Sequence, residues 1–183
     1  MKKFFQLRDD LAISNRWHVS DVLLQNGSEP VLDAGVRLQY SGHLLGRISR
    51  EGCFLDFSIT SFNVPIASIR LAKGMSLVAG GDIQCLPVKM DNGVDVIALN
   101  STRVVRCLDE RCSRFTKWTE SDGRPDLIGQ YRQVTKLALL PESIPQGAHF
   151  FRVQGWEVAL VVSEVLKDFM TREGCTGARF VEL

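Results

Sequence analysis

The longest stretch of regular apolar spacing in this chain runs from Glu157 to Arg172, and a fold for the chain has to bury the face that it forms. The apolar side chains recur at i, i+3, i+4, i+7, i+8 and i+11: Val158, Val161, Val162, Val165, Leu166 and Phe169. That spacing is typical of one face of an amphipathic helix. Gly174 follows as a helix stop. The segment therefore predicts a long C-terminal helix packed on a core.

Short strands dominate the prediction elsewhere. Ile83–Met90 and Val94–Leu99 are joined by Asp91-Asn92-Gly93, and Asn-Gly favours a type I′ hairpin turn. A middle helix is predicted from Pro65 to Val78, with Gly80 and Gly81 ending it. Other strands are predicted near the N-terminus and over residues 17–24, 36–40, 102–108, 130–140, 148–153 and 178–183.

These elements predict an α+β fold. It consists of mostly antiparallel short strands with a middle helix and one long C-terminal amphipathic helix followed by a short strand. A chain of 183 residues fits one domain, here 1–183, with a strand-rich part over 1–60 and an α+β part over 61–183.

The composition limits which kinds of binding partner and which cellular compartment are expected. The longest apolar run, Val158–Val162, is far shorter than the roughly 20 residues that cross a bilayer, so no membrane association is expected. The cysteines are odd in number and scattered at positions 53, 85, 107, 112 and 175. That distribution favours reduced thiols and a cytoplasmic protein. The formal net charge of +1 argues against a dedicated nucleic-acid binder.

The residue patterns of catalytic and cofactor sites are missing from the sequence. Only Cys107 and Cys112 lie near each other, without a nearby histidine, so no metal site is predicted. No glycine-rich phosphate loop is present, and no catalytic residue or cofactor is predicted. An alternative is an enzyme or small-ligand protein whose pocket is assembled from distant residues around His149 and Glu157.

The region from Asp109 to Gly129 is polar, rich in turns and without periodicity, and surface loops of this kind often carry function. Basic residues from Arg103 to Lys136 alternate with acidic ones, which leaves a net charge of about +3. Nucleic-acid binding is therefore a lesser alternative. Mixed charge with Trp, Tyr and Arg is typical of protein–protein hot spots. The predicted partner-binding residues are Trp118, Arg124, Asp126, Tyr131 and Arg132, with Trp17 as a more distant candidate.

Several segments, taken in order, resemble a known protein family. They are Leu55–Phe57, Val64–Pro65, Gly81–Val88, Val104–Asp109, His149–Trp156, Val162–Lys167 and Gly174–Phe180. Together they resemble the eleventh immunity-protein family of bacterial polymorphic toxin systems, which is common in myxobacteria and other proteobacteria. The resemblance covers the chain from about residue 50 to its end.

The resemblance implies an immunity protein, not an enzyme, that binds and neutralises a cognate toxin encoded by a neighbouring gene. It supplies no catalytic residues. The recurrent residues have structural interpretations: Phe150 and Trp156 as core aromatics, Gly177 as a turn residue, and Val162 and Leu166 as helix packing positions. An immunity protein of this kind blocks its toxin through a protein–protein interface.

Overall fold

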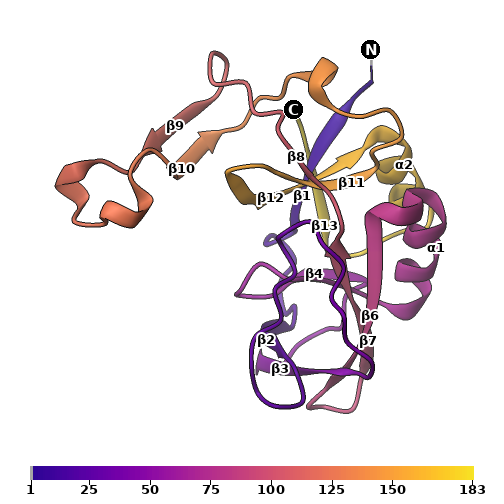
Figure 1. The fold of residues 1–183 in the computed structure, drawn as a ribbon. Coiled ribbons are helices and arrows are strands. Elements are labelled where there is room, and N and C mark those ends of the chain that lie inside the picture. The colour runs from indigo at the N-terminus through magenta and orange to yellow at the C-terminus, as the bar shows by residue number, and fades with distance from the viewer. Residues whose placement is uncertain (1) are drawn as a thin grey trace.

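The computed structural model describes residues 2–183 and is built mostly from β-strands (Figure 1). Within that range thirteen strands and two short α-helices are present. The strands are β1 (Phe4–Asp9), β2 (His18–Leu23), β3 (Leu44–Arg50), β4 (Phe57–Ile59), β5 (Pro65–Ala67), β6 (Ile83–Met90), β7 (Asp95–Ser101), β8 (Val104–Val105), β9 (Arg114–Lys117), β10 (Tyr131–Lys136), β11 (Phe150–Val153), β12 (Trp156–Ser163) and β13 (Ala178–Glu182). The helices are α1 (Ile69–Ala79) and α2 (Glu164–Arg172), and short 3-10 turns occur at η1 (Gly80–Asp82), η2 (Glu120–Asp122), η3 (Pro125–Leu127) and η4 (Pro141–Ser143).

The strands form two larger sheets and one separate hairpin. A five-stranded sheet has the order β13-β1-β12-β11-β8, and a six-stranded sheet has the order β2-β3-β6-β7-β5-β4. Strands β9 and β10 pair with each other and with no other described strand. β1 lies between β12 and β13, with Phe5 opposite Val162 and Leu7 opposite Phe180. Both ends of the chain therefore belong to one sheet.

The predicted long C-terminal amphipathic helix is wrong. β12 occupies residues 156–163, and helix α2 begins only at Glu164. β12 is buried on both faces: Leu160 lies in the core beneath the two helices, and Val161 lies in the core on the other side of the sheet. A strand covered on both sides carries apolar residues at successive positions, and a short run of that kind cannot be told from a helix by its spacing. Val162 is likewise a strand residue rather than a helix packing position.

The fold class is therefore mostly β, and the predicted α+β class is wrong. The middle helix exists, but it begins at Ile69 because Pro65–Ala67 forms strand β5. Gly74 of α1 contacts α2, since a Cβ at this position would lie 2.2 Å from Cζ of Phe169. Neither helix in the described part of the chain is long and apolar enough to cross a membrane.

The predicted strand over residues 36–40 is not formed. Its backbone groups bond to side chains of the six-stranded sheet instead. The Leu38 N–H donates to Gln84 Oε1 at 2.8 Å, and Gln84 Nε2 donates back to the Leu38 carbonyl at 2.9 Å. Asn100 Nδ2 donates to the Val36 carbonyl at 2.9 Å. These side-chain amides satisfy backbone groups that a neighbouring strand would otherwise satisfy.

The predicted β6–β7 hairpin is confirmed, but its turn is not of type I′. That turn needs positive φ at two central residues, and between the strands only Gly93 has one, at 84°. The Gly93 N–H donates to the Met90 carbonyl at 3.0 Å, and the Met90 N–H donates to the Val94 carbonyl at 2.9 Å. The connection is thus a three-residue loop with glycine in the left-handed position.

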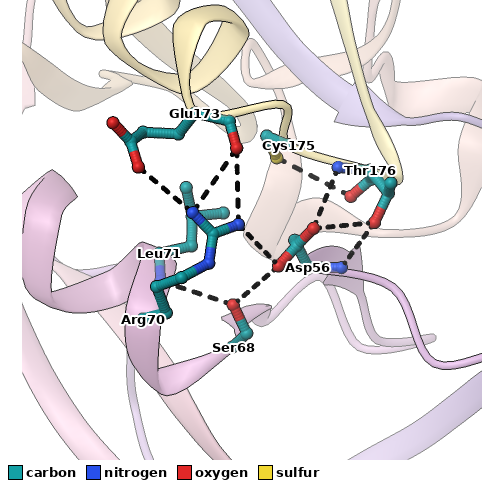
Figure 2. A network of polar contacts seen from close by, with 7 residues as sticks. All are labelled: Asp56, Ser68, Arg70, Leu71, Glu173, Cys175 and Thr176. Carbon is teal, nitrogen blue, oxygen red and sulfur yellow. Dashed lines mark hydrogen bonds and ion pairs between the residues drawn. The ribbon is translucent and has the colours of Figure 1, made fainter.

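A polar network fastens the segment before α1 to the segment after α2 (Figure 2). The Asp56 carboxylate accepts hydrogen bonds from Thr176 Oγ1 at 2.9 Å and from Ser68 Oγ at 3.0 Å, and it pairs with Arg70 at 3.2 Å. Arg70 also pairs with Glu173 at 3.1 Å. Burial alone raises the pKa of Asp56, but the hydrogen bonds from Thr176 and Ser68 and the charge of Arg70 bring this pKa below its usual value. The carboxylate is therefore held in its charged form.

Gly177 has the turn role that the sequence indicated. Its φ is 88°, and a Cβ would lie 2.1 Å from the Phe57 carbonyl oxygen, so a side chain has no room there. Phe150 is fully buried in the core, as predicted, and Trp156 is partly buried at the edge of the core on the other side of the five-stranded sheet.

Candidate functional site

A hairpin projects from the body of the molecule (Figure 1). It spans residues 114–136, namely β9, β10 and the loop between them, and is called the arm below. None of these residues is buried. Two-stranded hairpins are marginally stable by themselves in water. The arm therefore depends on polar and aromatic contacts among its own residues and with the body.

One set of contacts orders the outer part of the arm. The Arg132 guanidinium lies 4.8 Å from the centre of the Trp118 ring, a cation–π contact. Arg132 also pairs with Asp122. The Asp122 carboxylate accepts from the backbone N–H of Thr119 at 2.8 Å, and this bond, with that from the Thr119 hydroxyl, lowers the pKa of Asp122. Trp118, the first residue after β9, is thus held against Arg132 of β10 while it stays partly exposed.

An ion pair lies farther along the loop. Arg124 donates to the two carboxylate oxygens of Asp126 at 3.0 and 2.8 Å. Both side chains are more than half exposed. An exposed pair of this kind adds little stability. Its positive and negative groups therefore remain accessible to a partner.

Tyr131 is the first residue of β10, at the end of the two strands next to the loop, and it joins the arm to the body. Its hydroxyl donates to Glu110 Oε1 at 2.6 Å, and Lys117 Nζ donates to the same oxygen at 2.7 Å. The ring packs against Gly155 in the β11–β12 turn, where a Cβ would lie 3.3 Å from two ring carbons. Burial, followed by the bond to Glu110, raises the pKa of Tyr131 to about 12. The phenol is therefore a neutral donor at physiological pH.

A cleft of about 780 Å³ lies between the arm and the body. Lys117 and Tyr131 line it from the arm, and Arg106, Gln154 and Glu157 line it from the body. Because successive side chains of a strand point to opposite faces, Trp118 and Arg132 lie on the face away from Lys117 and Tyr131. The arm thus has one face toward the cleft and one toward solvent.

Five of the six predicted partner-binding residues lie in the arm: Trp118, Arg124, Asp126, Tyr131 and Arg132. In the structure Trp118 contacts Arg132, and Arg124 pairs with Asp126. Trp17 lies elsewhere: it is 2% exposed in the core, where its indole N–H donates to Ser58 Oγ at 2.9 Å. It presents no surface to a partner in this conformation.

The sequence patterns did not point to Phe115, Glu110 or Gly155. Phe115 contacts the Tyr131 ring edge-to-face, with centroids 5.1 Å apart. The alternation of Phe115 with its polar neighbours Arg114 and Thr116 is a short strand signal that could have placed β9 inside the region first assigned to turns. The contacts of Glu110 and Gly155 join positions far apart in sequence, and local patterns carry no sign of them.

The alternative pocket around His149 and Glu157 is not assembled. His149 Nδ1 lies 2.8 Å from Ser163 Oγ, and its backbone N–H donates to Asp82 at 2.7 Å. Glu157 Oε1 accepts from the Gly155 N–H at 2.7 Å. In the β11–β12 pair, His149 lies beside Ser163 while Glu157 follows the turn at the opposite end. The two side chains therefore do not converge on one substrate.

The cysteines do not form a metal site with other ligands. Within residues 2–183 no three histidine, cysteine or carboxylate side chains are grouped as metal ligands. Cys107 is buried, and burial raises the pKa of its thiol to about 12. Cys112 is exposed, and its hydrogen bond to Asp109 raises its pKa as well. Neither thiol has the lowered pKa that favours a reactive thiolate.

Comparison with known proteins gives one family. The sequence model of the immunity protein family Imm11 matches residues 89–183, just over half of the 183-residue chain. The matched range holds the whole arm, helix α2 and the strands from β7 onward. A search of curated proteins finds no match.

Proposed function

Because the chain belongs to the Imm11 immunity protein family, as the resemblance in its sequence predicted, we propose that it binds a cognate bacterial toxin and neutralises it by occlusion. In this proposal the protein is not an enzyme. It covers the active site or the substrate channel of the toxin with its own surface. A standard interface for this purpose buries roughly 1,600 Å² in total.

The arm is the proposed centre of that interface. The observation that carries the proposal is that residues 114–136 contain no buried residue and are nevertheless ordered by their own ion pairs and by the contact of Trp118 with Arg132. Trp, Tyr and Arg are the residues that dominate binding energy at protein interfaces. A projecting segment also reaches into a concave active site, which a flat face cannot do.

The proposed partner is a protein rather than nucleic acid or a membrane. The arm carries five basic and three acidic residues, a formal net charge of +2, and its basic residues are largely paired with acids. A phosphate-binding surface needs unpaired positive charge. The same proposal assigns the protein to the cytoplasm, which the five free cysteines support.

The test uses an inactivated form of the toxin encoded beside this gene. Binding to the full chain is measured by calorimetry, and protection is measured as survival of cells that express the active toxin. We expect wild-type binding and protection. The double variant Trp118→Ala, Arg132→Ala removes the aromatic–guanidinium pair and should weaken binding by at least about 30-fold, since hot-spot residues contribute ~2 kcal/mol or more.

A matched control is Leu77→Ala, because this leucine is 81% exposed on α1 and lies outside the arm. It should bind and protect like the wild type. Circular dichroism should show all variants folded, since the arm contributes nothing to the buried cores. Absence of toxin binding by the wild-type chain would refute the proposed function. If the double variant binds the toxin as tightly as the wild type does, the arm is not part of the interface.

A further inference from the structure

Three neighbouring hollows on the body share lining residues and form one trough. The cleft beside the arm shares Gln154 and Glu157 with the next hollow, which in turn shares Asp33 with a pocket of about 330 Å³. The trough therefore runs from Lys117 and Tyr131 of the arm, past the β11–β12 turn, to the loop between β4 and β5 that contains Phe62. In Figure 1, β12 lies to the right of the arm and β4 lies lower on the body.

The far end of the trough contains two buried polar atoms without hydrogen-bond partners among residues 2–183. They are Nε of Arg152 and Oδ1 of Asp21, and both residues line the 330 Å³ pocket. Arg152 is only 1% exposed. Its guanidinium donates to backbone carbonyls, of Glu157 at 2.6 Å and of Asn63 at 2.9 Å, and pairs with no carboxylate within 4.0 Å. The nearest cation to Asp21 Oδ1 is Arg47, at 4.0 Å.

An unsatisfied donor and an unsatisfied acceptor in one pocket call for a ligand that offers both functions, because leaving such groups unpaired costs free energy. An extended peptide does so. A backbone carbonyl of the peptide can accept from Arg152 Nε, and an N–H of its side chain or backbone can donate to Asp21 Oδ1, once the lining side chains move apart, because both atoms are covered in the free protein. A purely apolar side chain satisfies neither atom.

The far half of the trough consists of the 330 Å³ pocket and the hollow next to it, and its charge selects the kind of peptide that can bind. Four carboxylates line it, from Asp21, Glu29, Asp33 and Glu157, against the single guanidinium of Arg152, which leaves a formal net charge of −3. Glu29, Asp33 and Glu157 form no ion pair among the described residues. An acidic peptide is repelled by this lining, whereas a basic side chain is attracted.

Exposed apolar side chains border the same end. Phe62 is 60% exposed and Val31 is 61% exposed, and both line the pocket. Val158 is 54% exposed, and its carbonyl accepts from Asn63 Nδ2 at 3.3 Å, next to Phe62. Apolar groups around a polar centre are the usual composition of a protein interface.

We propose that this trough is the docking groove for an extended, basic segment of the toxin, which lies across Asp33 with a basic side chain at Asp21 and its backbone on Arg152. The inference rests on the proposed function and gives the chemistry of the partner. In it, the arm and the trough hold the toxin from two sides. Phe62 and Val31 supply the apolar contacts around the basic side chain.

The experiment is a calorimetric titration of the full chain with the inactivated toxin of the neighbouring gene, at two salt concentrations. The double variant Glu29→Gln, Asp33→Asn removes two exposed charges from the trough. We expect its Kd to rise at least tenfold and to depend less on salt than that of the wild type. The control variant Glu51→Gln, Asp95→Asn removes two exposed charges outside the trough and should stay within twofold of wild type.

A second readout observes the buried arginine directly. The ¹⁵N–¹H signal of Arg152 Nε should shift when the toxin is added, because this donor gains an acceptor. If the wild type binds but the trough variant binds equally well, or the Arg152 signal stays unchanged, the docking groove is refuted while the proposed function stands. If the wild type does not bind at all, both proposals fall.

Discussion

The attachment of the arm to the body can be tested by adding a single methyl group at Gly155. This glycine has a φ of 80°, and a Cβ would lie 3.3 Å from Cδ2 and Cε2 of Tyr131. Alanine in the left-handed region costs about 1–2 kcal/mol. The methyl group must in addition push the Tyr131 ring away by a few tenths of an ångström. Gly155→Ala therefore changes both backbone strain and the position of the arm.

Gly147→Ala separates these two effects. Gly147 has a φ of 78°, and a Cβ there would meet nothing within 4 Å. Both variants should lose about 1–2 kcal/mol of unfolding free energy. For a chain of this size each kcal/mol lowers Tm by roughly 2–4 °C. Only Gly155→Ala should also disturb Tyr131.

The assay follows the Tyr131 ring. The chain has two tyrosines, so ¹³C-labelled tyrosine in a Tyr40→Phe background gives one set of ring signals. In that background Tyr131 should titrate near its pKa of about 12, and in the Gly155→Ala variant it should titrate lower, since the ring loses burial and its bond to Glu110 lengthens. If both alanine variants lose equal stability and Tyr131 titrates unchanged in both, the ring does not fix the arm to the β11–β12 turn.

Three further predictions concern the body of the molecule. Asp56→Asn should lower the unfolding free energy by about 1–3 kcal/mol in urea titrations, because charged hydrogen bonds such as that from Thr176 are lost. Since the folded pKa of Asp56 is lowered, the difference from wild type should be full above about pH 4 and should shrink as pH falls through the folded pKa. Trp17→Phe leaves the buried Ser58 hydroxyl without its donor and should cost about 1–3 kcal/mol in thermal unfolding; an unchanged Tm contradicts this. Phe62→Ser should alter stability by less than about 0.5 kcal/mol, because the side chain is 60% exposed, while calorimetry should show weaker toxin binding; unchanged binding contradicts the trough.

The candidate site was only partly predictable. Sequence composition located the aromatic and charged residues of the arm, because turn-rich segments with Trp, Tyr and Arg are typical of interfaces. It also included Trp17, which the tertiary structure buries beside Ser58. Nothing in the sequence around Arg152 distinguished it from any other arginine of a strand. Its burial follows from the packing of the loops that contain Asn63 and Asp33 over it.

Local signals determined those elements whose partners are close along the chain. The β6–β7 hairpin joins neighbouring segments through a glycine turn, and α1 ends at Gly80 as expected, because alternation and glycine conformation act over a few residues. The family was also predicted from the sequence, because several short segments typical of it occur there in order. Tertiary structure decided what depends on distant residues: β12 is a strand because β1 and β11 flank it and cores cover both its faces, and residues 36–40 stay irregular because Gln84 and Asn100 satisfy their backbone. Burial from both sides and long-range pairing leave no periodic trace in a short apolar run.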